Sequence, residues 1–286
     1  RDARHGSAAF QAVAAAVLAA RGIRVHLLEG PTPTPLTPFA VRRLGAGAGI
    51  VITASHNPPK DNGYKVYWDH GAQIAPPTDA HIAAAIDRQP PANEVPRAGP
   101  GAPEVEARQD LVEAYLRALE GLRFVPEAPV GALSIVYTAM HGVGGALFVE
   151  ALRRRGFERV EVVPEQHAPD PDFPTVTFPN PEEAGALDLA KARARAVGAD
   201  LVLANDPDGD RLAAVARCPR RGWVQLSGND VGVLLARHLI DHDQPEDTSR
   251  LVVSTVVSSR LLGRMAKDLG VRHAETLTGF KHIAAT

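Results

Sequence analysis

Short apolar runs alternate with helix-like segments along most of the chain, and this alternation restricts the fold more than any other feature. The apolar runs that read as strands lie at residues 23–28, 48–53, 133–137, 160–163, 201–203 and 251–254. The run at 48–53 is apolar at nearly every position, which is typical of a strand with both faces covered. Strands that alternate with helices predict parallel pairing and layered packing. We therefore expect an α/β protein, with successive three-layer α/β domains and mixed, mostly parallel sheets.

The expected helices lie at residues 7–20, 36–44, 107–120, 182–197 and 231–240. Ser7 has the side chain of an N-cap, and Gly22 is suited to end the first helix. Zones rich in Pro and Gly at residues 89–103 and 122–131 flank the third helix, and a polar stretch covers residues 241–249. These zones predict three domains, at residues 1–125, 126–245 and 246–286. The chain begins without Met and stops soon after an apparent strand, so we expect both ends to be truncated.

Composition limits the classes of partner. The formal net charge is -2 and no block of like charges occurs, which argues against nucleic acid or an anionic membrane as the main partner. A small anionic molecule remains compatible with a local basic site. The single cysteine cannot form an internal disulfide, and no apolar run approaches the roughly 18 residues of a membrane span. The sequence therefore predicts a cytoplasmic protein.

A polar loop follows the apolar strand at 48–53. Ser55, His56 and Asn57 come directly after it, and an Asn-Gly turn then leads into a strand that carries Lys65. Ligand sites of α/β proteins lie at such strand ends. Ser55 can serve there as a nucleophile or as a phosphoryl carrier. No Gly-x-Ser-x-Gly elbow is present, which weighs against a hydrolase, and a plain polar loop remains the alternative.

A second polar loop follows the strand at 201–203. Its acidic residues Asp206, Asp208 and Asp210 occupy alternate positions, and such carboxylates can converge on one hard cation. The EF-hand pattern fails, because arginines stand where its glycine and its bidentate glutamate belong. A phosphatase with Asp206 as nucleophile remains open, although Asp210 replaces the threonine of that motif. A solvated acidic turn is the other alternative.

Two weaker signals complete the candidate residues. Thr278 and Gly279 form a turn after the last strand, and Lys281 follows, so that this turn can hold a phosphate or simply reverse the chain. Arg4 belongs to an Asp-x-Arg sequence, which can brace the loop of Ser55 or form a surface ion pair.

Taken in their order along the chain, the motifs resemble those of the α-D-phosphohexomutases, the phosphoglucomutase/phosphomannomutase family. Residues 53–58 are similar to its phosphoserine loop, residues 206–211 to its magnesium loop, and residues 278–279 to its sugar-binding turn. The resemblance covers nearly the whole chain. The segments most similar to the branch that includes phosphopentomutase-active enzymes are residues 61–74, 170–183 and 275–281.

The resemblance implies roles residue by residue. Ser55 would carry the phosphoryl group, with His56 and Lys65 assisting proton transfer and neutralising charge. Magnesium would be held by an oxygen of phosphorylated Ser55 and by Asp206, Asp208 and Asp210. The residues implied in substrate binding are Arg211, Thr278, Gly279 and Lys281, and those implied in supporting the loop are Arg4 and Asn57.

The implied reaction is that of a phosphosugar mutase. Ser55 would give its phosphoryl group to a sugar phosphate, and the other phosphate of the resulting bisphosphate would return to Ser55. Phosphate thereby moves between O1 and O6, or O5 of a pentose. Mg²⁺ is the expected cofactor and glucose 1,6-bisphosphate, or an equivalent, the expected activator. Phosphoglucomutase is the activity we expect first; the alternatives are phosphomannomutase, phosphopentomutase, a magnesium phosphatase using Asp206, and a non-catalytic sugar-phosphate-binding fragment.

Some motifs of the family have no match in the chain. An upstream Gly-Thr-x-Gly-x-Arg motif and a downstream Gly-Glu-x-x-x-Ser loop are both missing, as is the final phosphate-binding domain. The chain would then hold most of the first of four domains, all of the second and the opening of the third. We expect little or no mutase turnover from these 286 residues, and activity in the full-length parent.

Overall fold

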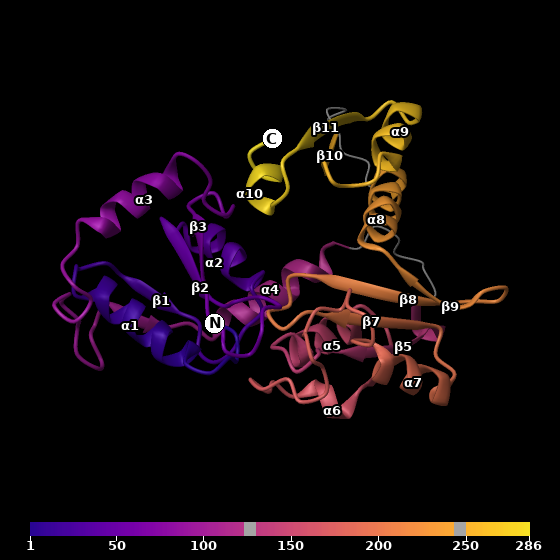
Figure 1. The fold of residues 1–286 in the computed structure, drawn as a ribbon, viewed down its shortest axis with the longest axis horizontal. Coiled ribbons are helices and arrows are strands. Elements are labelled where there is room, and N and C mark those ends of the chain that lie inside the picture. The colour runs from indigo at the N-terminus through magenta and orange to yellow at the C-terminus, as the bar shows by residue number, and fades with distance from the viewer. Residues whose placement is uncertain (123–129, 243–249) are drawn as a thin grey trace.

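The computed structural model describes residues 1–122, 130–242 and 250–286, which form three α/β parts. The N-terminal part (residues 1–122) lies to the left in Figure 1, the central part (130–226) to the lower right, and the C-terminal part (228–242 and 250–286) above the central part. The domain boundaries expected after residues 125 and 245 lie outside the described residues.

The N-terminal part contains two strand pairs. Strand β2 (Ala48–Ile52) pairs antiparallel with β3 (Tyr64–Trp68), and β1 (Val25–Leu27) pairs parallel with β4 (Val105–Ala107). Its helices are α1 (Ser7–Ala19), α2 (Leu36–Leu44), α3 (Thr78–Asp87) and α4 (Asp110–Glu120). The expected helix at 107–120 thus begins three residues later, because residues 105–107 form a strand.

The start of α1 corrects the expected N-cap. Gly6 holds the N-cap position, with a φ of 78° that suits glycine, and Ser7 is the first helical residue. The Ser7 hydroxyl donates a hydrogen bond to the Asp2 carbonyl at 2.9 Å instead of capping the helix. Ser7 therefore ties the helix to the segment before it.

A five-stranded mixed sheet forms the central part, with strand order β6-β5-β7-β8-β9. The parallel strands β5 (Ser134–Thr138), β6 (Arg159–Val162) and β7 (Leu201–Asn205) are followed by an antiparallel hairpin of β8 (Leu212–Cys218) and β9 (Gly222–Leu226). The helices of this part are α5 (Gly145–Arg154), α6 (Pro164–His167) and α7 (Asp188–Val197), and a 3₁₀ turn spans Val130–Ala132.

Both faces of this sheet are covered. Val136 and Val202 point to one face and pack against Ala190 and Ala194 of α7. Tyr137, the next residue along β5, points to the other face and packs with Val149 of α5. Alternation along the strand places successive side chains in separate cores, which confirms the three-layer α/β prediction.

The expected helix at 182–197 is shorter in the structure. Helix α7 begins at Asp188, and residues 180–187 form turns instead. The Asn180 side chain accepts a hydrogen bond from the Glu182 amide at 3.1 Å, which favours a turn over a helix at this point.

The C-terminal part pairs β10 (Leu251–Thr255) with β11 (Arg272–Thr276) in parallel. Its helices are α8 (Gly228–His242), α9 (Leu261–Asp268) and α10 (Phe280–Ile283), and α10 lies on the side facing the N-terminal part (Figure 1). Across residues 1–122, 130–242 and 250–286, none of the helices has the length and apolar character needed to cross a membrane.

Candidate active site

The loop of Ser55 connects β2 to β3 and is closed by short backbone contacts. The Thr53 amide donates to the Gly63 carbonyl at 3.1 Å, and the Ser55 amide donates to the Thr53 hydroxyl at 2.9 Å. A Cβ atom at Gly63 would lie 2.3 Å from the Thr53 carbonyl oxygen, so only glycine fits there. Ser55 itself has a φ of 53°, a left-handed conformation that a serine rarely adopts. The loop therefore presents Ser55 in a constrained geometry.

Arg4 supports this loop through hydrogen bonds to its backbone carbonyls. Its guanidinium donates to the carbonyl oxygens of Ser55 (2.7 Å), Asn57 (2.6 Å) and Pro58 (2.6 Å), and more weakly to that of Asp61 (3.3 Å). Arg4 is buried, and its Nε lies 3.1 Å from the equally buried Asp2 carboxylate. A planar cation with several donors can satisfy converging carbonyls that no neutral group could.

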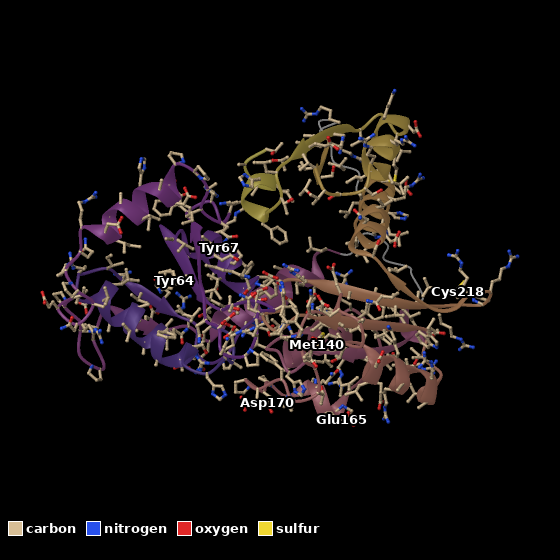
Figure 2. The ribbon with its side chains drawn as sticks, viewed as in Figure 1. Tyr64, Tyr67, Met140, Glu165, Asp170 and Cys218 are labelled. Atoms are coloured by element: carbon tan, nitrogen blue, oxygen red, sulfur yellow. The ribbon has the colours of Figure 1, made fainter. Side chains whose placement is uncertain are left out.

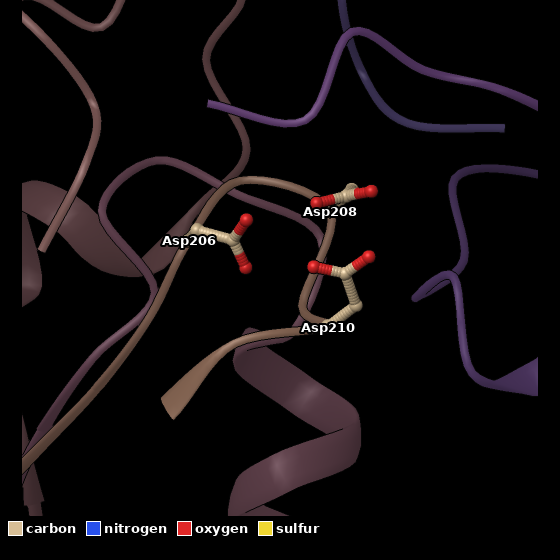
Figure 3. Close-up of side chains that lie close together, drawn as sticks. All are labelled: Asp206, Asp208 and Asp210. Carbon is tan, nitrogen blue, oxygen red and sulfur yellow. The ribbon is translucent and has the colours of Figure 1, made fainter. Parts of the chain in front are cut away.

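The acidic loop follows β7 directly. The Gly209 amide donates to the Asp206 carbonyl at 3.0 Å, which turns the chain, and the Arg211 amide donates to Asp206 Oδ1 at 3.0 Å. Asp206 and Asp208 are fully buried, and Asp210 is partly exposed. One carboxylate oxygen of each lies within 4.8 Å of the others, and the three side chains face a common space (Figure 3).

The two loops meet although they come from different sheets. The Ser55 hydroxyl donates to Asp206 Oδ2 at 3.1 Å and lies 3.3 Å from His56 Nδ1. Lys65 reaches the acidic loop from β3, with its Nζ 2.7 Å from Asp208 Oδ2 and 2.8 Å from Asp210 Oδ2. The structure thus brings together Ser55, His56, Lys65 and the three aspartates.

Burial and mutual repulsion decide the charges at this site. Burial raises the pKa of Asp206 to about 8, and the neighbouring Asp208 and Asp210 act in the same direction. Burial also favours the neutral form of Asp208, but the ammonium of Lys65 outweighs it and lowers the pKa of that carboxyl. Burial alone would lower the pKa of Lys65, yet Asp208 and Asp210 outweigh it and raise the pKa. Lys65 is therefore a fixed positive charge.

The carboxylates fit a hard divalent cation. Asp208 Oδ1 is buried and has no hydrogen-bond partner among the described residues. A buried carboxylate oxygen without a partner is costly unless a ligand satisfies it. Oxygen ligands of this kind suit Mg²⁺ better than they suit softer metals. The three aspartates can therefore hold a metal, as the sequence predicted.

The other residues predicted near Ser55 and Asp206 contact the site in different ways. His56 lies beside Ser55, and burial, with a further contribution from Arg211, lowers the pKa of its imidazole. Arg211 contacts Asp206 through its backbone, while its side chain is exposed. Asn57 contributes a carbonyl rather than its side chain.

The turn near the C-terminus stands apart. Thr278 and Gly279 lead from β11 into α10, and Lys281 Nζ lies 3.9 Å from Asp79 Oδ2 on α3. Within the described ranges, no hydrogen bond or ion pair links these three residues to the loops of Ser55 and Asp206. Their part in sugar binding stays a prediction.

Thr34 belongs to the site and was missed from the sequence. Its amide donates to the Asp208 carbonyl and its hydroxyl to Asp208 Oδ2, both at 2.8 Å. The stretch at 31–35 alternates proline with threonine, so it reads as a rigid connector. The signal available in the sequence was the hydroxyl side chain of Thr34 between two prolines, because a rigid connector can hold such a side chain in one place.

Family models match almost the whole chain. The models described as phosphoglucomutase/phosphomannomutase, alpha/beta/alpha domains I, II and III match residues 1–92, 113–220 and 227–286, respectively. The matches follow the order of the three parts of the structure.

Similar proteins include curated enzymes and a solved structure. A probable phosphomannomutase of Haemophilus influenzae is 40% identical over 287 residues, covering 99% of this chain and 58% of that protein. A probable phosphoribomutase of Schizosaccharomyces pombe is 41% identical over 304 residues, covering 99% of this chain and 49% of that protein. The structure of a putative phosphomannomutase from Thermus thermophilus matches with a TM-score of 0.82 and 29% identity, over 98% of this chain and 60% of that one. The chain spans about half the length of the curated relatives it matches.

Proposed function

The chain belongs to the phosphoglucomutase/phosphomannomutase family, and from this premise we propose that it acts as a phosphosugar mutase whose phosphoryl carrier is Ser55. One observation carries the proposal. The Ser55 hydroxyl lies 3.1 Å from Asp206 although the two residues are 151 positions apart, and Lys65 binds the other two aspartates. A serine that hydrolyses an ester has no need of an acidic cluster, whereas a phosphoserine needs positive charge nearby, which Lys65 and a cation held by the three aspartates would supply.

The chain's own residues would divide the work of phosphoryl transfer. In the proposed step the bond between phosphorus and Ser55 Oγ breaks, a bond to a sugar hydroxyl oxygen forms, and that hydroxyl loses its proton. His56, whose Nδ1 lies 3.3 Å from Ser55 Oγ, is placed to move a proton. Lys65 stays charged and offsets negative charge throughout the step. Ser55 Oγ ends with a proton in place of the phosphoryl group.

Asp206, Asp208 and Asp210, together with Ser55 when it carries phosphate, would hold Mg²⁺ in the proposed enzyme. When bound, the ion would supply positive charge that stabilises the phosphoryl group in transfer. Thr34 and Lys65 orient Asp208, and the Arg211 amide orients Asp206. These contacts support a preorganised acidic site.

For the substrate we propose a hexose phosphate, with glucose 1-phosphate first and mannose 1-phosphate or a pentose phosphate as alternatives. Other relatives are named phosphopentomutase and phosphoglucomutase, so the names of the relatives support the class of sugar phosphates rather than one sugar. The residues proposed to contact the substrate remain Arg211, Thr278, Gly279 and Lys281.

The proposal is tested by finding where phosphate becomes attached. The full-length protein is incubated with labelled glucose 1,6-bisphosphate and Mg²⁺, digested, and mapped by mass spectrometry. We expect the label on Ser55, and its loss in Ser55→Ala, while Ser259→Ala, a serine in the C-terminal part, should label like the wild type. Label on Asp206 would instead support a magnesium phosphatase and contradict the mutase.

A further inference from the structure

Four residues other than glycine have a left-handed backbone among those described: Ser55, Met140, His141 and Phe173, with φ values of 53°, 49°, 61° and 47°. A residue in this conformation is strained and persists only where its surroundings enforce it. Of the four, only His141 belongs to the types enriched in this conformation, which are Asn, Asp and His. Where these four residues lie therefore indicates which backbone segments the structure holds in place.

Three of the four, Ser55, Phe173 and His141, are joined by a series of contacts that begins at the serine loop. Arg4, which binds the Ser55 carbonyl, lies over the ring of Phe173, with its guanidinium carbon 5.2 Å from the ring centroid. The Phe173 amide donates to the Asp170 carbonyl at 3.3 Å, and the Asp170 amide donates to the His141 carbonyl at 3.0 Å. A continuous set of contacts thus runs from Ser55 to His141, across the two parts of the chain.

A hydrogen-bond network that is buried except at Thr175 supports His141. His141 Nε2 lies 2.8 Å from the Thr175 hydroxyl, which accepts a bond of 2.8 Å from Gln166 Nε2. Gln166 Oε1 in turn accepts from the Thr138 hydroxyl at 2.7 Å. Gln166 and Thr138 are fully buried, and hydrogen bonds between buried polar groups favour one conformation. In Figure 2, Met140 and Asp170 lie where the central part faces the N-terminal part.

The same segment packs against the acidic loop. The Val143 amide donates to the Pro207 carbonyl at 2.8 Å, and Pro207 stands between Asp206 and Asp208. A Cβ atom at Gly142 would lie 2.5 Å from Pro207 Cα and 2.6 Å from Pro207 O. Both are backbone atoms, so any side chain at position 142 would have to displace the acidic loop.

We propose that His141, Gly142 and Phe173 are positioning residues, which set the acidic loop and the serine loop at a fixed separation. The inference rests on the proposed function, because it concerns the placement of Ser55 and the aspartates in that reaction. Gly142 acts on the acidic loop through Pro207. Phe173 acts on the serine loop through Arg4, and His141 anchors the segment that joins the two.

The two loops can be tested separately in the full-length protein, because different residues position them. Gly142→Ala should weaken Mg²⁺ binding, measured by calorimetry, by about 10-fold or more, as loss of an outer contact to a metal site commonly does. Gly232→Ala is the matched control, since a Cβ atom there meets nothing within 4 Å. Phe173→Leu should keep the Mg²⁺ affinity and slow the labelling of Ser55 by glucose 1,6-bisphosphate by about 10-fold. Phe173→Tyr, which keeps the aromatic face, should restore the rate.

The outcomes separate this inference from the proposed function. If wild type binds Mg²⁺ and labels on Ser55 while Gly142→Ala and Phe173→Leu behave like wild type, the positioning role is wrong and the proposed function stands. If Phe173→Leu lowered the metal affinity, the labelling rate and the melting temperature together, a general loss of folding would explain the result. The positioning role would then be wrong. A wild-type chain that neither binds Mg²⁺ nor labels on Ser55 would contradict both. If Gly142→Ala does not fold, the comparison of Phe173→Leu with Phe173→Tyr tests the positioning role by itself.

Discussion

At the scale of single residues, Lys65 decides the electrostatics of the site. Its ammonium lies within 2.8 Å of two carboxylates, one of them fully buried. Without it, Asp208 and Asp210 would face each other and Asp206 with no counter-charge among the described side chains that contact them. The metal-free site therefore depends on one lysine.

Lys65→Met keeps the length of the side chain and removes its charge. We expect the unfolding free energy of the metal-free chain to fall by about 3 kcal/mol, because the buried carboxylates lose their partner. Mg²⁺ supplies positive charge to the same carboxylates, so it should raise the melting temperature more in the variant than in the wild type. Thermal unfolding with and without Mg²⁺ measures both effects.

Lys60→Met is the control for this variant, because Lys60 is an exposed lysine of the same loop. It should match the wild type in both conditions. An equal Mg²⁺ shift in Lys65→Met and wild type would show that Lys65 and the cation do not serve the same charges.

At the scale of elements, helices α4 and α5 link the N-terminal and central parts. Arg154 of α5 donates to both carboxylate oxygens of Glu113 on α4, at 3.0 and 2.8 Å. These bonds, together with that from Arg117, lower the pKa of Glu113 to about 2. The pair is partly exposed, so its contribution is modest, but it connects two separately layered parts of the molecule.

Glu113→Gln should lower the melting temperature slightly at neutral pH, and the gap to wild type should close in acid. The unfolded chain takes up a proton near the ordinary pKa of 4.5, whereas the folded chain resists it down to about 2. The contribution of the carboxylate is therefore complete above about 4.5 and is lost as the pH falls toward about 2. Melting curves across this range test it. A gap that does not change with pH would rule out the charge as its cause, and Glu150→Gln, which removes only a bond within α5, should show a smaller gap.

Some elements were predictable because their signals are local. The apolar runs before Ser55 and Asp206 identify strands, and polar residues directly after such a strand indicate a site. The expectation that both faces of the strand at 48–53 are covered was wrong, because β2 pairs antiparallel with β3 alone among the described strands and is buried only at Val51 and Ile52. The hairpin of β8 and β9 was not predicted, because its alanines and charged residues lack a clear strand pattern and are stabilised by pairing with β7. Residues 182–187 have helix-forming composition, yet they form turns, and the Asn180 side chain accepts a hydrogen bond from the Glu182 amide at the first of them.

At the scale of the whole molecule, the candidate site exists only because distant segments converge. Thr34 binds the backbone and side chain of Asp208, and His5 Nε2 lies 2.8 Å from Asp172 Oδ1, so the N-terminal part contacts the central part at several points. The sequence singled out the residues of both loops that the structure brings together, since each loop has its own motif. It did not predict their support by Thr34, His141, Gly142 and Phe173, because those contacts arise only when the two parts pack together.

The fate of phosphate on Ser55 tests the central claim most directly. The full-length protein is labelled by radioactive glucose 1,6-bisphosphate, freed of excess reagent, and mixed with Mg²⁺ in the presence or absence of glucose 6-phosphate. A phosphoryl carrier predicts that the label leaves Ser55 faster when the sugar phosphate is present and is recovered as sugar bisphosphate. Release as inorganic phosphate alone, at the same rate with and without the sugar phosphate, would contradict the account.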